Sequence, residues 1–316
     1  MNDIKGGLVG FAVGDAIGVP IEFEDRKKLM KSPVTSLKGY GSYDVPKGVW
    51  SDDTSMTLAT IDSIIKCKGI NYNDIADRFC NWLNNAEYTA TDEVFDIGIT
   101  IKYALMRYWE DKSDATKCGG TSINENGNGS LMRMLPIAFY CYYKNLNKKE
   151  IFNIVKKVSS ITHAHEISIM GCYIYVRYIL FLLNKNDKIT SYDMLKNIDY
   201  SEFFSHETIE KYNRILKSNI KKLKVDSIDS NGYIISTLES VIWIILNCNS
   251  YSQSIIGAIN LGGDTDTIGA ITGSIAGIIY GYKEIPKKWL KQMKRLDYLE
   301  QVATNFTNFL EQNKSR

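Results

Sequence analysis

Hydrophobic residues recur at three- and four-residue spacing along most of the chain, which is the period of an α-helix with one buried face. This pattern predicts helices at 3–18, 54–66, 72–84, 97–109, 130–143, 148–160, 164–183, 201–223, 234–247, 267–281, 286–293 and 296–312. Few segments alternate between polar and apolar residues as strands do, and no sequence repeat or low-complexity linker is present. We therefore predict an all-α fold and a single domain over residues 1–316.

Two segments break the helical period. Residues 24–50 contain two prolines and several glycines, which predicts a loop-rich connection. Residues 111–129 are polar and glycine-rich, which predicts a long ordered loop or a flap. Pro136 lies inside the predicted helix 130–143, where a proline removes a backbone hydrogen bond, so we expect a kink there.

Acidic and hydroxyl side chains are concentrated where two apolar helices begin. Near the C-terminal end, Asn-Leu-Gly-Gly-Asp-Thr-Asp-Thr at 260–267 places Asp264 and Asp266 just before a helix of small residues. Far upstream, Trp-Ser-Asp-Asp-Thr-Ser-Met at 50–56 opens another apolar helix. Capping explains either motif alone, because Asp, Ser and Thr are preferred at helix N-termini. If folding joined the two motifs, their carboxylates with Ser51, Thr265 and Thr267 would form an all-oxygen site suited to Mg²⁺ or Mn²⁺.

The helix predicted at 3–18 is rich in glycine, which would let another helix or a ligand approach its backbone closely. Asp15 lies in its apolar last turn and is expected to have hydrogen-bond partners, because burying a lone carboxylate is costly. Glu22 follows Pro20 and is either a rigidly held site residue or a solvated loop charge like Glu24. Asp96 is a further candidate, or simply the N-cap of the helix at 97–109.

Three segments could hold a phosphate-containing or nucleotide ligand. The glycine-rich loop at 126–130 runs into a predicted helix, where backbone N–H groups favour an anion, although Asn-Gly pairs mark ordinary turns far more often. His163 and His165 stand between two helices and would point apart on a helix, which disfavours a shared metal. Tyr233 at a helix entrance is either a core residue or a platform for a base.

Composition narrows the function classes. The net charge of +2 comes from interspersed charges of both signs, so we expect no nucleic-acid partner. The six cysteines include no Cys-x-x-Cys pair, which indicates a reducing compartment and disfavours structural zinc. We find no apolar run of the roughly 18 residues that spanning a bilayer requires. We therefore expect a cytoplasmic protein without membrane contact, and a monomer, because no coiled-coil heptad is sustained.

Taken in order, these segments resemble the ADP-ribosylglycohydrolase family, which includes the bacterial dinitrogenase reductase-activating glycohydrolases. The matching segments are Gly14–Glu22, Trp50–Met56, Phe95–Gly98, Asn128–Arg133, Thr162–His163, Gly232–Tyr233 and Gly262–Thr267. Each motif is short, but their ordered combination covers most of the chain and is specific.

The resemblance implies a compact orthogonal bundle of helices around a centre of two Mg²⁺ or Mn²⁺ ions. The implied metal ligands are Ser51, Asp52, Asp53, Asp264, Asp266 and Thr267. Many relatives have threonine at the position of Ser51, which keeps a hydroxyl ligand. The implied catalytic residues are Glu22, Asp53, Asp96 and Asp264. The positions implied to hold ADP-ribose are Gly127, Asn128, Gly129, Ser130, His163, Gly232 and Tyr233.

The resemblance also implies a hydrolase that removes mono-ADP-ribose from a modified protein side chain and so reverses ADP-ribosylation. The segment Phe95–Gly98 favours an arginine linkage, with serine-linked or other ADP-ribosyl substrates as alternatives. A non-catalytic ADP-ribose-binding protein on the same fold is a second hypothesis. A third, a phosphoryl-transfer enzyme, needs a basic clamp beside the metals, for which Arg133 is the one plausible residue.

Overall fold

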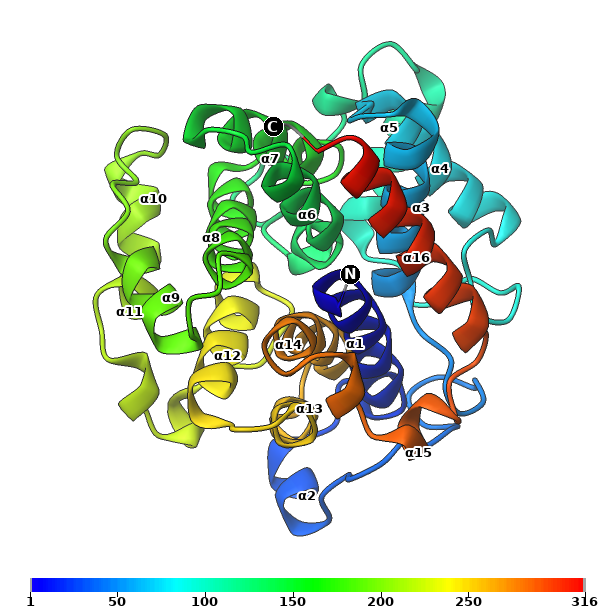
Figure 1. Ribbon diagram of the computed structural model, residues 1–316, viewed down its shortest axis with the longest axis vertical. Coiled ribbons are helices and arrows are strands. Elements are labelled where there is room, and N and C mark those ends of the chain that lie inside the picture. The colour runs from blue at the N-terminus through cyan, green and yellow to red at the C-terminus, as the bar shows by residue number, and fades with distance from the viewer. Residues whose placement is uncertain (1, 315–316) are drawn as a thin grey trace.

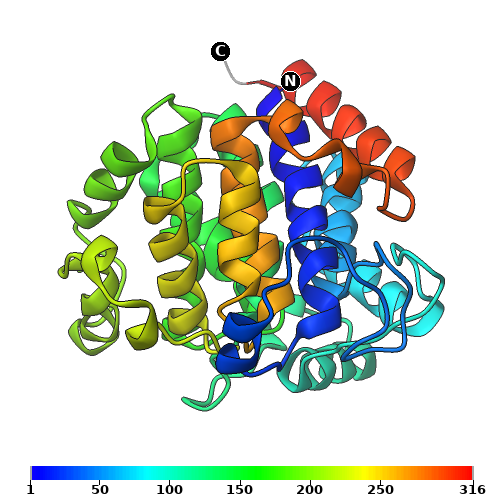
Figure 2. The same ribbon diagram turned by 90° about the horizontal axis from the view of Figure 1, so that it is seen from below.

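Two glycine-rich helices, α1 (Asn2–Gly18) and α14 (Thr265–Tyr280), lie side by side in the middle of the molecule (Figures 1 and 2). Glycines recur at every fourth position on the facing sides of both helices. A Cβ atom added to Gly14 would lie 2.0 Å from the carbonyl oxygen of Gly269, and one on Gly10 would lie 2.5 Å from that of Gly273. Glycine is therefore required for the two backbones to touch. The antiparallel register brings the C-terminal end of α1 to the start of α14.

The remaining helices surround this pair. The computed structural model describes residues 2–314. The other α-helices are α2 (Arg26–Lys31), α3 (Asp52–Cys67), α4 (Tyr72–Asn85), α5 (Ile99–Glu110), α6 (Leu135–Tyr143), α7 (Lys148–Ser160), α8 (Glu166–Leu183), α9 (Lys188–Lys196), α10 (His206–Lys211), α11 (Asn213–Leu216), α12 (Ile234–Asn247), α13 (Tyr251–Ile259), α15 (Lys287–Leu290) and α16 (Leu296–Gln312). The 3₁₀ helices are η1 (Val19–Ile21), η2 (Ala115–Lys117), η3 (Asn128–Arg133), η4 (Ile220–Lys222), η5 (Val225–Ser227) and η6 (Tyr282–Glu284).

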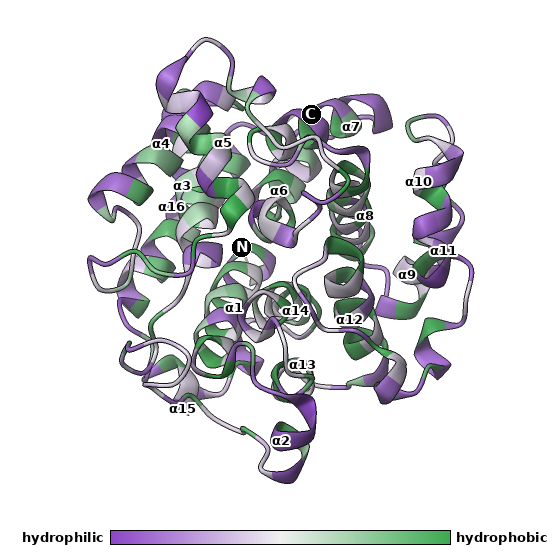
Figure 3. Ribbon diagram, turned by 180° about the vertical axis from the view of Figure 1, so that it is seen from behind, coloured by the Kyte–Doolittle hydropathy of each residue, from purple (hydrophilic) through white to green (hydrophobic). Residues whose placement is uncertain are grey.

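The predicted all-α class is confirmed, since residues 2–314 contain no β-strand beyond two isolated bridges. The helices predicted at 148–160, 234–247 and 296–312 have those bounds in the structure. In Figure 3, α8 and α12 are largely hydrophobic, whereas the outer helices α2 and α10 are largely hydrophilic. The hydrophobic pattern therefore located largely buried helices, such as α12, as well as helices with one solvated face, such as α16.

Other predicted helices were wrong. The helix predicted at 201–223 is three short pieces, α10, α11 and η4. It breaks at Tyr212, whose hydroxyl donates to the Ile167 carbonyl at 2.7 Å and fixes the turn by a tertiary contact. The short helices α2, α9 and α13 were not predicted. The kink expected at Pro136 is absent, because η3 ends at Arg133 and Pro136 occupies the first turn of α6. A missing N–H costs no hydrogen bond there.

Two helices contradict the prediction that no apolar run is long enough to span a bilayer. The segments Asp3–Ile21 and Glu166–Leu183 have the length and hydropathy of a span. Most of each segment is buried inside the bundle, and core helices of globular proteins meet the same criterion.

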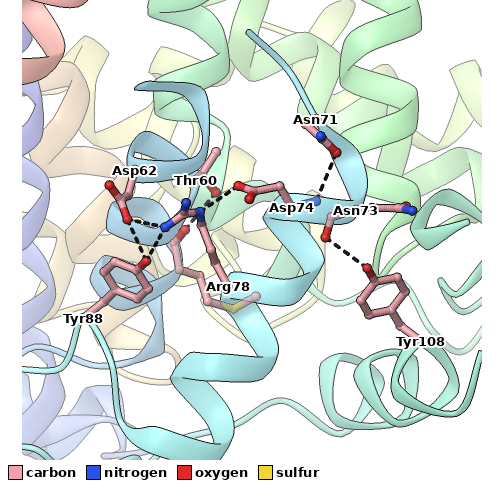
Figure 4. Close-up of polar contacts among 9 residues, drawn as sticks. Thr60, Asp62, Asn71, Asn73, Asp74, Arg78, Tyr88 and Tyr108 are labelled. Carbon is pink, nitrogen blue, oxygen red and sulfur yellow. Dashed lines mark hydrogen bonds and ion pairs between the residues drawn. The ribbon is translucent and has the colours of Figure 1, made fainter. Parts of the chain in front are cut away.

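The loop between α4 and α5, which carries Asp96, is anchored at its beginning. Arg78 of α4 donates to Asp74 at 2.7 Å, to the Tyr88 hydroxyl at 2.9 Å, and to Asp62 of α3 (Figure 4). The Tyr88 carbonyl accepts from the Trp50 indole at 3.1 Å. These contacts fasten the start of the loop to α3 and α4 and to the acidic motif that begins at Trp50.

Candidate active site

A cavity of about 280 Å³ lies where the end of α1 meets the first turns of α3 and α14. Its walls combine carboxylates on one side with a glycine-rich segment and an imidazole on the other. The lining residues are Glu22, Phe23, Asp52, Asp53, Asp96, Gly98, Ile99, Thr100, Ile101, Gly127, Asn128, Gly129, Met132, His163, Gly232, Asp264 and Thr267. The two acidic motifs, about 210 residues apart in the sequence, thus share one cavity.

Asp15 fixes the position of the first acidic motif. Its carboxylate accepts hydrogen bonds from the Ser51 N–H at 2.9 Å and from both the N–H and the hydroxyl of Thr54, at 3.1 and 2.5 Å. This carboxylate of α1 therefore caps the N-terminus of α3 from another helix. Burial raises the Asp15 pKa to about 7, although its hydrogen bonds oppose the rise. The sequence singled out Asp15 as a residue that needs partners, but it did not indicate that these would lie on α3.

Ser51 acts as a local cap, as the capping alternative predicted. Its hydroxyl accepts from the Asp53 N–H at 3.3 Å, and it is not among the residues that line the cavity. Asp52 and Asp53 follow in the first turn of α3, and both line the cavity. Burial, together with the charges of neighbouring carboxylates, raises both pKa values well above the ordinary range.

A double-glycine turn fixes the second motif. Gly262 and Gly263 both have φ of +73°, a left-handed conformation that favours glycine. The Gly263 N–H donates to the Glu24 carbonyl at 3.1 Å, and the Gly263 carbonyl accepts from the Phe23 N–H at 2.7 Å. This pairing places the segment of Glu22 beside that of Asp264.

Asp264 stands at the N-cap position of α14, but its side chain does not cap the helix. It accepts instead from the Asn128 amide at 2.7 Å, and Asn128 also donates to the Thr237 hydroxyl at 2.9 Å. The capping alternative is therefore wrong for this residue. Thr267 donates to Asp53 at 3.3 Å, which joins the two motifs directly. Thr265 does not take part, since its hydroxyl donates to the Gly18 carbonyl at 2.9 Å.

Asp266 is almost fully buried and is not among the residues that line the cavity. Neither of its carboxylate oxygens has a hydrogen-bond partner among the described residues. One ligand atom from each of Glu22, Asp96 and Asp266 lies within 4.8 Å of the others. Burial and the charges of Glu22 and Asp96 raise the Asp266 pKa well above its ordinary range. Burial, followed by the charges of Asp96 and Asp264, raises the Glu22 pKa to about 9. Glu22 is thus a buried site residue and not a solvated loop charge.

Asp96 lines the same side of the cavity, and Tyr43 lies next to it outside the lining. Asp96 is not the N-cap of α5, because that position is held by Gly98. Its backbone is left-handed, with φ of 55°. Tyr43, from the loop before α3, lies beside Glu22 and Asp96, and burial and their charges raise the pKa of its phenol. Sequence reasoning missed Tyr43, because nothing distinguishes it within the irregular segment 24–50.

The wall of the cavity opposite the carboxylates, which we call the cradle, is formed by Gly127, Asn128, Gly129 and Gly232. The Asn128 N–H donates to the Gly232 carbonyl at 3.0 Å, and the Asn126 carbonyl accepts from the Ile234 N–H at 3.0 Å. A Cβ atom on Gly129 would lie 2.8 Å from Ile101 Cδ1 and 3.0 Å from His163 Cε1. The absence of a side chain at Gly129 therefore leaves room for the cavity.

His163 is buried and lines the cavity, with Nδ1 at 2.8 Å from the Thr162 hydroxyl. Burial and the nearby Arg133 charge lower its pKa to about 3, so the imidazole is neutral at physiological pH. His165 is instead the N-cap of α8, accepting from the Ile167 N–H, so the two histidines share no site.

Three other candidates lie outside the cavity lining. Ser130 is buried in the core, where its hydroxyl contacts Ser159 at 3.0 Å and Cys172 at 3.3 Å. Tyr233 occupies the N-cap position of α12 without a side-chain capping bond and is 38% exposed. Arg133 is fully buried and donates to Val158 and Thr162, so it cannot act as the basic clamp that a phosphoryl-transfer enzyme needs.

This donor set fits a hard divalent cation. Several carboxylates of the site lie close together, and the two carboxylate oxygens of Asp266 accept no hydrogen bond from the described residues. The other oxygen atoms nearby belong to hydroxyl and amide groups. Mg²⁺ and Mn²⁺ prefer such all-oxygen surroundings. Protein oxygens held in this way are costly to bury without a positive charge between them.

Comparisons with known proteins identify the family of this chain. The family model for ADP-ribosylglycohydrolase matches residues 1–315. The chain belongs to the ADP-ribosylglycohydrolase family. It is 31% identical to the ADP-ribosylarginine hydrolase Tri1 of Serratia proteamaculans, over 96% of this chain and 78% of that protein. It is 26% identical to the ADP-ribosyl-[dinitrogen reductase] glycohydrolase of Rhodospirillum rubrum, over 91% of this chain and 89% of that protein.

The fold of this ADP-ribosylglycohydrolase family member also matches a solved structure. An ADP-ribosylglycohydrolase-related protein complex superposes with a TM-score of 0.81 at 24% identity, and the match covers 98% of each chain. This likeness confirms the helical fold that the resemblance implied.

Proposed function

We propose that this protein is a metal-dependent hydrolase that releases ADP-ribose from ADP-ribosylated arginine side chains of proteins. The observation that carries the proposal is the unpartnered Asp266 carboxylate, which lies within 4.8 Å of ligand atoms of Glu22 and Asp96, two residues that line a cavity whose other wall is a glycine-rich cradle. The arginine linkage is supported by the 31% identity to a protein named ADP-ribosylarginine hydrolase and by the segment Phe95–Gly98.

The carboxylates of both acidic motifs would hold the cations. In this proposal Asp52, Asp53, Asp264, Asp266 and Thr267 are the ligands, and Ser51 adds its hydroxyl after releasing the cap of α3. Bound Mg²⁺ or Mn²⁺ would supply the positive charge that fixes the ribose hydroxyls and polarises a water molecule.

The chain's own residues would do the proton transfer. Cleavage at the ribose anomeric carbon develops oxocarbenium-like positive charge, which the neighbouring carboxylates of Asp96 and Asp264 would stabilise. A carboxyl group held beside the scissile bond can give its proton to the leaving group and accept one from water. Glu22 borders the cavity next to Asp96 and Asp266, so we assign it the acid–base role.

The cradle would bind the rest of ADP-ribose. The side chain of Asn128 is oriented by its bonds to Thr237 and Asp264. The neutral His163 ring can share a hydrogen bond with the ligand without adding charge. The glycines at 127, 129 and 232 let the ligand approach the backbone.

The test is release of free ADP-ribose from an arginine-linked conjugate with Mg²⁺, with Mn²⁺ and with a chelator. We expect metal-dependent release, and Asp96→Asn should reduce it at least about tenfold. Asp92→Asn is the matched control, because Asp92 belongs to the same loop, has the same left-handed backbone (φ of 59°) and lies outside the cavity.

Release from a serine-linked conjugate alone would reject the arginine assignment. Metal-dependent binding of ADP-ribose without turnover of any conjugate would reject the enzyme in favour of a binding protein.

A further inference from the structure

The outer face of α5 carries four large apolar side chains that are exposed to solvent, with the charged residues Lys102 and Glu110 exposed among them. Ile99, Tyr103, Met106 and Trp109 recur at spacings of four, three and three residues and are between 47% and 74% exposed. The inner face of the same helix already buries four side chains, Ile101, Ala104, Leu105 and Tyr108. A helix of a globular protein usually needs only one apolar face. The second set of apolar side chains therefore indicates an interaction surface.

This face begins at the active-site cavity. Ile99 and Thr100, in the first turn of α5, line the cavity. From Ile99 to Trp109 the helix rises by roughly 15 Å. At the far end, Met106 and Trp109 line a second hollow of about 490 Å³ between α5 and α4. Figure 1 shows α4 and α5 adjacent on the outside of the molecule. The apolar surface thus runs from the cavity mouth to a groove.

Phe23 adds a second apolar group to the mouth. It lines the cavity, is 72% exposed, and has a left-handed backbone with φ of 64°. This conformation is unfavourable for a bulky residue. The hydrogen bond from its N–H to the Gly263 carbonyl maintains it. The mouth is therefore bordered by two solvent-facing apolar side chains, Phe23 and Ile99.

We propose that the outer face of α5, from Ile99 to Trp109, is the docking surface for the polypeptide that carries the ADP-ribosyl group. The proposal rests on the proposed function. A modified side chain that enters the cavity brings its own backbone to the mouth, and the neighbouring residues of that polypeptide then lie over the face that starts there. Because four large apolar side chains dominate this face, the segment that it fits carries apolar side chains beside the modified residue.

The test compares two synthetic peptides of about 15 residues, long enough to reach from the cavity past the end of α5. Each has a central ADP-ribosylarginine; one has leucine and phenylalanine in its flanks, and the other has serine and glycine. Free ADP-ribosylarginine is the third substrate. We expect the KM of the native enzyme to be about tenfold lower for the apolar peptide than for the polar one.

The double variant Tyr103→Glu/Met106→Glu should abolish this preference and leave kcat and KM for free ADP-ribosylarginine within about twofold of the native values. The matched control is Ile189→Glu/Met194→Glu, which changes two exposed apolar residues of α9 on the opposite side of the molecule (Figure 1). The control should keep the preference.

Equal KM values for the two peptides with the native enzyme would overturn the proposal, as would a preference that survives in the Tyr103→Glu/Met106→Glu variant. A dimer that this variant dissociates in sedimentation would overturn it too, because a second copy would then cover the face. An enzyme inactive on free ADP-ribosylarginine disproves the proposed function instead. The same peptide comparison is then made by binding, with free ADP-ribose as the small ligand.

Discussion

The Asp266 carboxylate is almost fully buried, close to the carboxylates of Glu22 and Asp96, and receives no hydrogen bond from the described residues. Such an arrangement destabilises the folded chain when no cation is bound, because like charges are buried together. A carboxylate that destabilises the metal-free fold in this way is expected to serve a ligand, here a bound cation. Function and stability therefore oppose each other at this residue.

Replacing Asp266 by asparagine should separate these two effects. We expect Asp266→Asn to lower activity at least about 100-fold, beyond the 10–100-fold typical of residues that merely support a ligand. We also expect the metal-free variant to be more stable than the metal-free native protein by about 1 kcal/mol. Initial rates and urea unfolding in a chelator measure both effects. Asp226→Asn, at an exposed carboxylate of η5, should change neither quantity.

The α1–α14 pair shows how an element can define a site without contributing most of its side chains. The backbones touch at glycines, so no side chain can adjust to absorb a shift of one helix against the other. Asp15 at the end of α1 and Asp266 at the start of α14 are therefore held in a fixed relation. The positions of the carboxylates follow from the register of the two helices.

Gly14→Ala should destabilise the protein by about 3 kcal/mol, although alanine is the better helix former. The reason is the 2.0 Å approach of the added Cβ to the Gly269 carbonyl, which forces the helices apart. The denaturant midpoint measures the change. Gly69→Ala is the control, because its Cβ would meet nothing closer than the Tyr140 hydroxyl at 3.6 Å. If both variants unfold at the same denaturant concentration, the close contact is not what the stability depends on.

The sequence was informative where local rules decide the structure. The helix at 148–160 has an Asn147–Glu150 capping box and an amphipathic pattern, so both its position and its ends could be predicted. The acidic motifs could be found because they break apolar runs. The cap that Asp15 provides for α3, the position of Tyr43 and the tertiary break at Tyr212 could not, because each depends on a partner far away in the sequence. The single-domain, cytoplasmic and monomer predictions remain predictions.

Across the whole molecule, buried acids make stability depend on pH and on cations. Burial raises the pKa values of Asp15 to about 7 and of Glu22 to about 9, and those of Asp52, Asp53 and Asp266 are also raised. Between the unfolded values near pH 4 and these folded values, the metal-free folded state binds more protons than the unfolded state. Its stability therefore falls as pH rises through that window, by about 1.4 kcal/mol per pH unit for each proton of difference.

We accordingly expect the metal-free protein to have a lower Tm at pH 8 than at pH 5.5, and Mg²⁺ or Mn²⁺ to raise Tm more at pH 8. Thermal unfolding with a chelator and with each cation at both pH values measures this. A metal-free Tm that rises from pH 5.5 to pH 8 would contradict the expectation, and so would a cation effect that is the same at both pH values.

The contact between α1 and α14 also has a consequence for biosynthesis. A ribosome makes α1 first and reaches α14 about 250 residues later, a delay of roughly 10–50 s at usual bacterial and eukaryotic elongation rates. Throughout this delay the apolar helix α1 lacks its packing partner α14, and the second acidic motif has not yet been synthesised. We therefore expect the nascent chain to need protection from aggregation. Its candidate active site can form only when translation is almost complete.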